Sequence, residues 1–127
     1  MVLYKLTRGR VGGRVEGMPC LLLRTIGRRS GKPHTVCLSY LPDGDSMVIV
    51  GSFGGADHHP AWYHNLRANP EVIVQNMGRT FAATAETITG AERERVWEQR
   101  VAGAPRYAHY QERTDRRIPL VRLVECE

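Results

Sequence analysis

Short apolar runs that alternate with clusters of turn-forming residues limit most strongly how this chain can fold. The clusters are 27–33 (GRRSGKP), 42–45 (PDGD) and 76–78 (NMG). Glycine, proline and aspartate suit turn dihedrals, and the runs between the clusters are rich in residues that suit a pleated sheet. This pattern predicts hairpin-linked strands at 20–25, 34–41, 46–52, 71–75 and 79–87, with a closing strand at 120–124.

Two or three short helices interrupt these strands. Pro60 lies where a helix can begin, and the helical spacing that follows stops at Asn69 and Pro70. Thr89, with Glu92 three residues later, matches a capping box and predicts a helix that runs to about Ala102. Five to six strands with short helices predict a mainly β fold, an antiparallel barrel or sandwich.

The length of the chain and its apolar content favour one compact unit. The 127 residues, 42% of them hydrophobic, suffice for a single domain spanning 1–127. The longest apolar runs, 21–23 and 47–50, are far shorter than the roughly 20 residues that cross a bilayer. Three widely spaced cysteines without a C-x-x-C pair suggest neither a disulfide framework nor a zinc ribbon. We therefore expect a soluble, cytoplasmic protein.

The charge of the chain favours anionic partners. The net charge is +5 and the pI is near 9.5, which suits nucleic acid, lipid head groups or a phosphorylated small molecule, and charge alone does not choose among them. The segment 1–17, which we expect to be mobile, is itself basic. It either makes peripheral contact with an anionic membrane or remains a solvated N-terminus, because its glycines weaken a helix.

The turn at 27–33 is the first candidate binding site. Arg28, Arg29 and Lys32 surround two glycines, so backbone N–H groups and three cations are available to a phosphate group. The alternative is a solvated basic turn that keeps the protein soluble.

The second candidate site is the stretch 50–72 (VGSFGGADHHPAWYHNLRANPEV). Gly54 and Gly55 allow the backbone to approach a ligand closely, and the following helix directs its N-terminal N–H groups toward the same place. The spacing of the histidines matches no metal-binding pattern, so we predict no metal site. Trp62 is interpreted by default as core packing.

The third candidate is a pair of tyrosines. Tyr107 and Tyr110 are three residues apart and therefore share one face if their segment is helical. Their phenols could then wall a pocket and donate hydrogen bonds, or serve only as packing.

Three motifs, taken in order, resemble those of one family. The motifs LLLRTIGRRSGKPH, VIVGSFGGADHHPAWYHNLRANPEV and YAHYQERTDRRIPLVRL are similar to those of the actinobacterial deazaflavin-dependent nitroreductases and quinone reductases. These form the A branch of the F420-dependent split-barrel oxidoreductases. The resemblance covers nearly the whole chain. It implies a split β-barrel of the FMN-binding type that passes a hydride from reduced coenzyme F420 to a quinone, nitroaromatic or activated-alkene acceptor.

The resemblance also implies site residues. Ser52, Tyr107 and Tyr110 would act in catalysis. The coenzyme would contact Arg28, Arg29, Ser30, His34, Cys37, Val50, Gly51, Ser52, Phe53, Ala61, Trp62, Asn65 and Tyr107. Because the coenzyme performs the hydride chemistry, no acid–base set is required. The expected partner is a small-molecule acceptor rather than nucleic acid, and the resemblance leaves the oligomeric state open.

Four residues depart from the family pattern. Phe53 and His34 stand where basic residues are common, which weakens or replaces part of the phosphate grip. Ser39 and Ala104 stand where relatives carry tyrosine, which implies a wider acceptor pocket. Two alternatives stay open: a split-barrel reductase that binds FMN, and a non-catalytic module that binds anionic surfaces.

Overall fold

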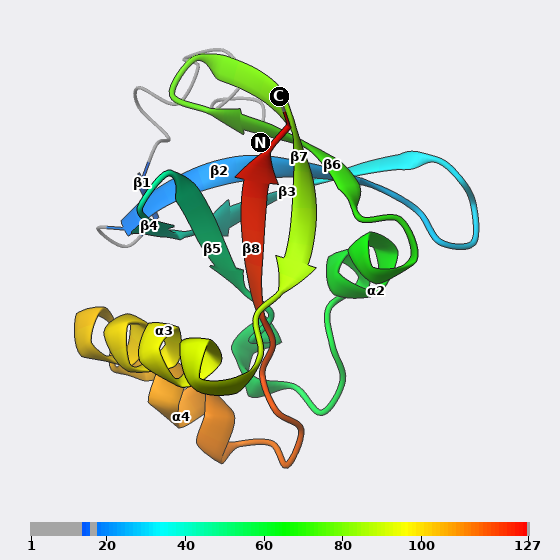
Figure 1. Cartoon of the computed structure of the whole chain (residues 1–127). Helices are drawn as coiled ribbons and strands as arrows, with labels where there is room; N and C mark the ends of the chain where they lie inside the picture. The colour runs from blue at the N-terminus through cyan, green and yellow to red at the C-terminus, as the bar shows by residue number, and fades with distance from the viewer. Residues whose placement is uncertain (1–13, 16–17, 127) are drawn as a thin grey trace.

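The structure, a computed structural model, describes residues 14–15 and 18–126 (Figure 1). Most of the basic segment predicted at 1–17 lies outside the described residues. The strands are β1 (Arg14–Val15), β2 (Met18–Ile26), β3 (Pro33–Ser39), β4 (Leu41–Asp43), β5 (Ser46–Val50), β6 (Glu71–Asn76), β7 (Arg79–Thr87) and β8 (Leu120–Glu125). The helices are α2 (Ala61–Ala68), α3 (Gly90–Gly103) and α4 (Arg106–Glu112), with a 3-10 turn, η1 (Phe53–Gly55).

The strands form one curled antiparallel sheet. Its order is β1-β2-β6-β7-β8-β5-β4, and β3 also pairs with β2. Figure 1 shows α3 and α4 together at one end of the sheet, below β5 and β8, while α2 lies beside the ends of β6 and β7. This is a split β-barrel, so the predicted mainly β fold is confirmed. Of the two predicted architectures, barrel and sandwich, the structure has the barrel.

The core of the molecule lies inside the curl. Alternate residues of β2 point to opposite faces of the sheet, and both faces are buried. Leu21 and Leu23 belong to the main cluster, whereas Cys20 and Leu22 pack with Cys37 on the other face. A further cluster joins β5 and β8 to α3 through Val48, Ile88, Val96 and Leu120. Truncating a fully buried leucine such as Leu23 to alanine costs about 2–5 kcal/mol, so these contacts fix the strands that border the site.

The strand predicted at 34–41 is broken in the structure. The pairing of β3 with β2 ends at Ser39, and Leu41 begins β4 by pairing with Val48 of β5. Tyr40 lies between the two strands, and its N–H donates to the Pro19 carbonyl. The turn is therefore shorter than the predicted 42–45 and contains Gly44, whose φ is +61°. The strand predicted at 46–52 ends earlier, at Val50.

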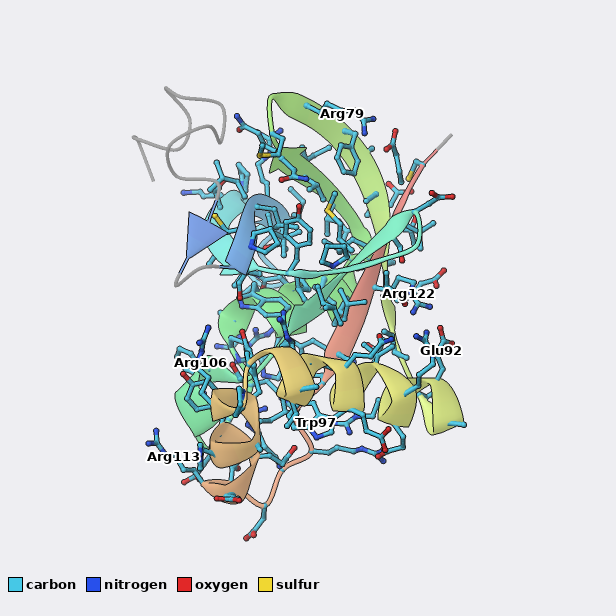
Figure 2. All side chains as sticks on the ribbon, turned by 90° about the vertical axis from the view of Figure 1, so that its left-hand side faces the viewer. Arg79, Glu92, Trp97, Arg106, Arg113 and Arg122 are labelled. Carbon is cyan, nitrogen blue, oxygen red and sulfur yellow. The ribbon has the colours of Figure 1, made fainter. Side chains whose placement is uncertain are left out.

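The capping box predicted at the start of α3 is wrong. Thr89 is the N-cap residue, but its side chain makes no cap hydrogen bond. Glu92 instead accepts a hydrogen bond from Arg122 of β8 (Figure 2). Arg122 also donates to Asp43 over 2.6 Å, and Arg95 of α3 donates to the same carboxylate over 3.3 Å. This ion-pair network, rather than a cap, ties α3 to the sheet.

Among the described residues, none of the helices has both the length and the apolar character needed to cross a bilayer.

Candidate functional site

A cavity of about 740 Å³ opens between β3, the loop after β5, α2 and α4. Every predicted site residue except Gly51 lines it: Arg28, Arg29, Ser30, His34, Cys37, Val50, Ser52, Phe53, Ala61, Trp62, Asn65, Tyr107 and Tyr110. Gly51 lies behind the wall, where an added Cβ would approach Pro119 to 2.7 Å. Six further lining residues are not among those predicted from the sequence: Thr25, Thr35, Val36, Leu38, Pro60 and Arg106. The segment from Thr35 to Leu38 could have been found, because it continues the strand that follows the basic turn.

One end of the cavity is basic and carries no acid. Arg28 and Arg29 are exposed there, whereas Lys32, the third cation of the turn, does not line the cavity. No aspartate or glutamate is among the lining residues. The guanidinium groups can therefore bind phosphate or carboxylate oxygens without competition from a neighbouring carboxylate.

Buried polar contacts fix the turn that presents these arginines. The Arg28 N–H donates to Asn65 Oδ1 over 3.1 Å, and Asn65 Nδ2 donates to Thr25 Oγ1 over 3.3 Å. Asn65 is 6% exposed, so α2 and β2 hold the start of the turn together. A Cβ at Gly27 would lie 2.6 Å from Ser30 Oγ and 2.9 Å from His34 Nε2. Glycine at this position lets both side chains approach the backbone.

The loop after β5 forms the floor of the cavity through backbone conformations that most residues avoid. Phe53, with φ +45°, is 54% exposed at the rim, although a non-glycine residue in this region costs about 1–3 kcal/mol. Gly54 and Gly55 have φ of +64° and +83°. A Cβ at Gly55 would lie 2.7 Å from the Tyr110 carbonyl oxygen, so this glycine allows the loop to contact α4.

Arg116 clamps this loop from the far side. Its Nε donates to the Ala56 carbonyl over 2.7 Å, and its Nη2 donates to the Ser52 carbonyl over 2.8 Å. Its Nη1 donates to the Gly51 carbonyl over 3.1 Å and lies 3.0 Å from His59 Nδ1. Burial and the nearby Arg116 lower the pKa of His59, which favours the neutral ring whose Nδ1 can accept this bond. No motif in the sequence points to this clamp.

The histidines of the loop pack against neighbouring aromatic rings. Across residues 14–15 and 18–126, no group of three or more His, Cys, Asp or Glu side chains could hold a metal ion. His59 packs edge-on against Tyr63 and His64 at centroid distances of 4.8 and 5.6 Å. These rings fill the space between the loop and α2.

The predicted tyrosine pair forms the wall opposite the basic turn. Tyr107 is 6% exposed, and its hydroxyl shares a hydrogen bond of 3.0 Å with Ser39 Oγ. The Tyr110 ring meets it edge-on, with centroids 5.6 Å apart. Ser39 lines the cavity, whereas Ala104 is buried in the cluster beneath Tyr107. Of the two small residues expected to widen the pocket, only Ser39 therefore lies at the cavity.

The curled barrel, with a basic turn and a pair of tyrosines lining one cavity, is an architecture that suits split-barrel oxidoreductases that work with a flavin-like coenzyme. The family model described as "F420H(2)-dependent quinone reductase" matches residues 1–125. The chain belongs to this family, and its coenzyme is F420.

Two named relatives agree with this assignment, and a third solved structure shares sequence and fold with the chain. An F420H(2)-dependent quinone reductase of Mycobacterium tuberculosis (strain ATCC 25618 / H37Rv) is 42% identical over 125 residues, covering 95% of this chain and 84% of its own. A solved F420-H2 dependent reductase (FDR-A) is 40% identical with a TM-score of 0.75, over 83% of this chain and 93% of its own. A solved structure described as a domain-swapped dimer is 36% identical with a TM-score of 0.76, over 96% of both chains.

The cavity fits an anionic, flat coenzyme. Its exposed guanidinium groups suit phosphate and carboxylate oxygens, and its acid-free lining places no carboxylate against them. Val36, Leu38, Val50 and Trp62 supply apolar walls for a planar ring system. The charge and the apolar lining of the site therefore both agree with the family's coenzyme.

Proposed function

We propose that this protein transfers a hydride from reduced F420 to a quinone, with nitroaromatic and activated-alkene compounds as further acceptors. One observation supports this proposal above the others: a single acid-free cavity has a cationic turn at one end and a tyrosine pair at the other. The first end suits the acidic part of the coenzyme, and the second suits an uncharged aromatic acceptor with polar oxygens.

The roles of the residues follow from their places along the cavity. Arg28 and Arg29 bind anionic groups of the coenzyme, together with Ser30 and His34, and the backbone from Val50 to Phe53 supports its ring. The start of α2, with Ala61, Trp62 and Asn65, closes the side of the site, and Cys37 contributes an apolar edge. Bound in this way, the coenzyme supplies the hydride, and the protein supplies orientation and excludes water.

The acceptor end needs a hydrogen-bond donor. When an acceptor takes up a hydride, negative charge develops on its oxygen, and a donor fixed in advance stabilises that charge. The hydroxyls of Tyr107, Tyr110 and Ser52 are the candidates, and a solvent proton completes the reduction. No metal ion takes part in this scheme.

The expected setting follows from the same proposal. We propose a cytoplasmic enzyme whose partner is a small-molecule acceptor rather than nucleic acid. Peripheral contact with an anionic membrane would suit a lipid-soluble quinone, and this part of the proposal rests on the basic composition of segment 1–17.

A coenzyme titration tests the proposal. Quenching of tryptophan fluorescence should report tighter binding of F420 than of FMN or FAD, since Trp62 lines the cavity. Menadione reduction should require F420H2, and NADPH should not replace it. Tighter FMN binding, with turnover by the FMN-bound protein, would identify an FMN-dependent enzyme instead.

Variants of the basic turn sharpen this test. Arg28→Ala and Arg29→Ala should each weaken F420 binding by about 1–3 kcal/mol, and the loss should shrink as salt rises. Lys32→Ala removes the same charge from the same turn without touching the cavity, so it should bind F420 like the parent. Equal losses in all three variants would mean that the turn acts only through its overall charge.

A further inference from the structure

Arg100 is a buried cation beneath the tyrosine wall. It belongs to α3, and 4% of its surface is exposed. Its Nε and Nη1 atoms are buried, and the described part of the chain offers them no hydrogen-bond partner. Such a group is rare, because buried polar atoms are nearly always paired.

Burial of this guanidinium is costly. A cation that is removed from water loses its favourable hydration free energy. Without a counter-charge, the protein compensates for little of this free energy. Burial accordingly lowers the pKa of Arg100, yet an arginine stays protonated near neutral pH. A methionine would fill similar space without this cost, so packing alone does not explain the charge.

Arg100 contacts the ring that borders the acceptor end of the cavity. Its Cζ lies 5.3 Å from the centroid of the Tyr107 ring. Arg106, at the start of α4 (Figure 2), has its Cζ 5.4 Å from the same centroid. Two guanidinium groups thus approach one phenol, and only Arg106 lines the cavity. A cation against the π-system withdraws electron density from the ring and makes the hydroxyl a stronger donor.

We infer that Arg100 is a positioning residue for the acceptor: acting through Tyr107, it directs a fixed positive charge toward the acceptor oxygen that becomes negative during reduction. The inference rests on the proposed function. In that step two electrons and one hydrogen nucleus pass to the acceptor, the coenzyme is oxidised, and a solvent proton later neutralises the anionic oxygen. A charge that is fixed before the reaction needs no reorganisation when the acceptor becomes anionic.

The two explanations of Arg100 predict opposite effects on stability. If Arg100 serves the reaction, Arg100→Met should leave Tm unchanged or raise it while slowing turnover. If Arg100 only stabilises the fold, the same variant should melt earlier and turn over normally. Arg95→Met is the matched control for turnover alone, because it removes the same charge from an exposed position on the same helix but also removes an ion pair with Asp43 that contributes to stability.

Steady-state kinetics with F420H2 and menadione form the first arm of the test. We expect kcat and kcat/KM of Arg100→Met to fall together by about 10–100-fold, with KM within about threefold of the parent, since the interaction strengthens only as charge develops. Arg100→Lys keeps the charge and should recover part of the loss. Arg95→Met should keep the parental kcat.

A binding experiment without coenzyme forms the second arm. Menadione is neutral, and 2-hydroxy-1,4-naphthoquinone of similar size is an anion at neutral pH. The parent should bind the anion more tightly than menadione. Arg100→Met should reduce this preference, measured as the ratio of the two dissociation constants, by about tenfold. The same preference should survive in Arg28→Ala, which separates binding at the acceptor end from binding at the basic turn.

A double-mutant cycle tests whether Arg100 acts through the hydroxyl. In a Tyr107→Phe background, the loss of Arg100 should lower kcat by less than about threefold, because the donor that it strengthens is already gone. Fully additive losses would overturn the inference, as would parental kcat in Arg100→Met with a lower Tm. If the parent itself fails to use F420H2, the proposed function fails, while the two naphthoquinones still test Arg100 independently.

Discussion

Replacing Gly55 by alanine would test the close contact between the cavity floor and α4. The φ of +83° at this residue costs an L-amino acid about 1–2 kcal/mol. The added Cβ would lie 2.7 Å from the Tyr110 carbonyl oxygen, and a backbone group cannot rotate away. The loop or the helix must then shift, at a further cost of about 1–3 kcal/mol. We therefore expect Gly55→Ala to lower the free energy of unfolding by about 2–5 kcal/mol.

Gly54→Ala is the matched control for this prediction. Gly54 has φ +64°, but its added Cβ would meet no atom within 4 Å, so only the conformational cost of about 1–2 kcal/mol applies. Urea unfolding of both variants should give a difference of about 1–3 kcal/mol, which isolates the contact with α4. Turnover should fall further in Gly55→Ala, since α4 carries the tyrosine pair. Equal destabilisation of the two variants would refute the reasoning.

Two further predictions concern polar side chains away from the cavity lining. Arg116→Gln should weaken F420 binding by about tenfold, because the floor of the site loses charge-assisted hydrogen bonds. In the same fluorescence titration, the control variant Arg117→Gln should bind F420 like the parent. Unchanged affinity in Arg116→Gln would contradict the role of the clamp. The hydrogen bond from Arg95 lowers the pKa of Asp43, so this carboxylate stabilises the fold at neutral pH, and that stability is lost as the pH falls below about 4. Asp43→Asn should therefore unfold at lower urea concentration at pH 7 and lose less stability than the parent between pH 5 and pH 3; parallel pH profiles would argue against the pair.

Local turn chemistry explains which parts of the fold could be predicted. The hairpins around Gly31, Gly44 and Gly78 follow from residues that favour turns whatever surrounds them. The break at Tyr40 could not be predicted, because Leu41 leaves the first hairpin only to pair with a strand farther along the chain. The capping box failed for a similar reason, since a distant arginine binds the glutamate.

In the site, too, features set by local sequence could be predicted and features set by distant contacts could not. Most of its lining residues were predicted through resemblance, because the motifs that carry most of them are contiguous in the sequence. Arg100 and Arg116 were missed, since an arginine in a helix or a turn is usually a solvated surface residue. Arg100 differs from such a residue in being buried. Arg116 differs in binding main-chain carbonyls about 60 positions away, such as the Ala56 carbonyl.

The clamp at Arg116 has a consequence for how such a site can diversify. Three of its four partners are main-chain carbonyls, which every amino acid possesses. Side chains along the loop other than His59, including the exposed Phe53, can therefore be exchanged without removing a partner of the clamp, provided that Gly55 keeps its conformation. Anchoring and selectivity are thus encoded in different atoms of the same loop, and substitutions at the cavity rim can alter which ligands fit while the floor keeps its position.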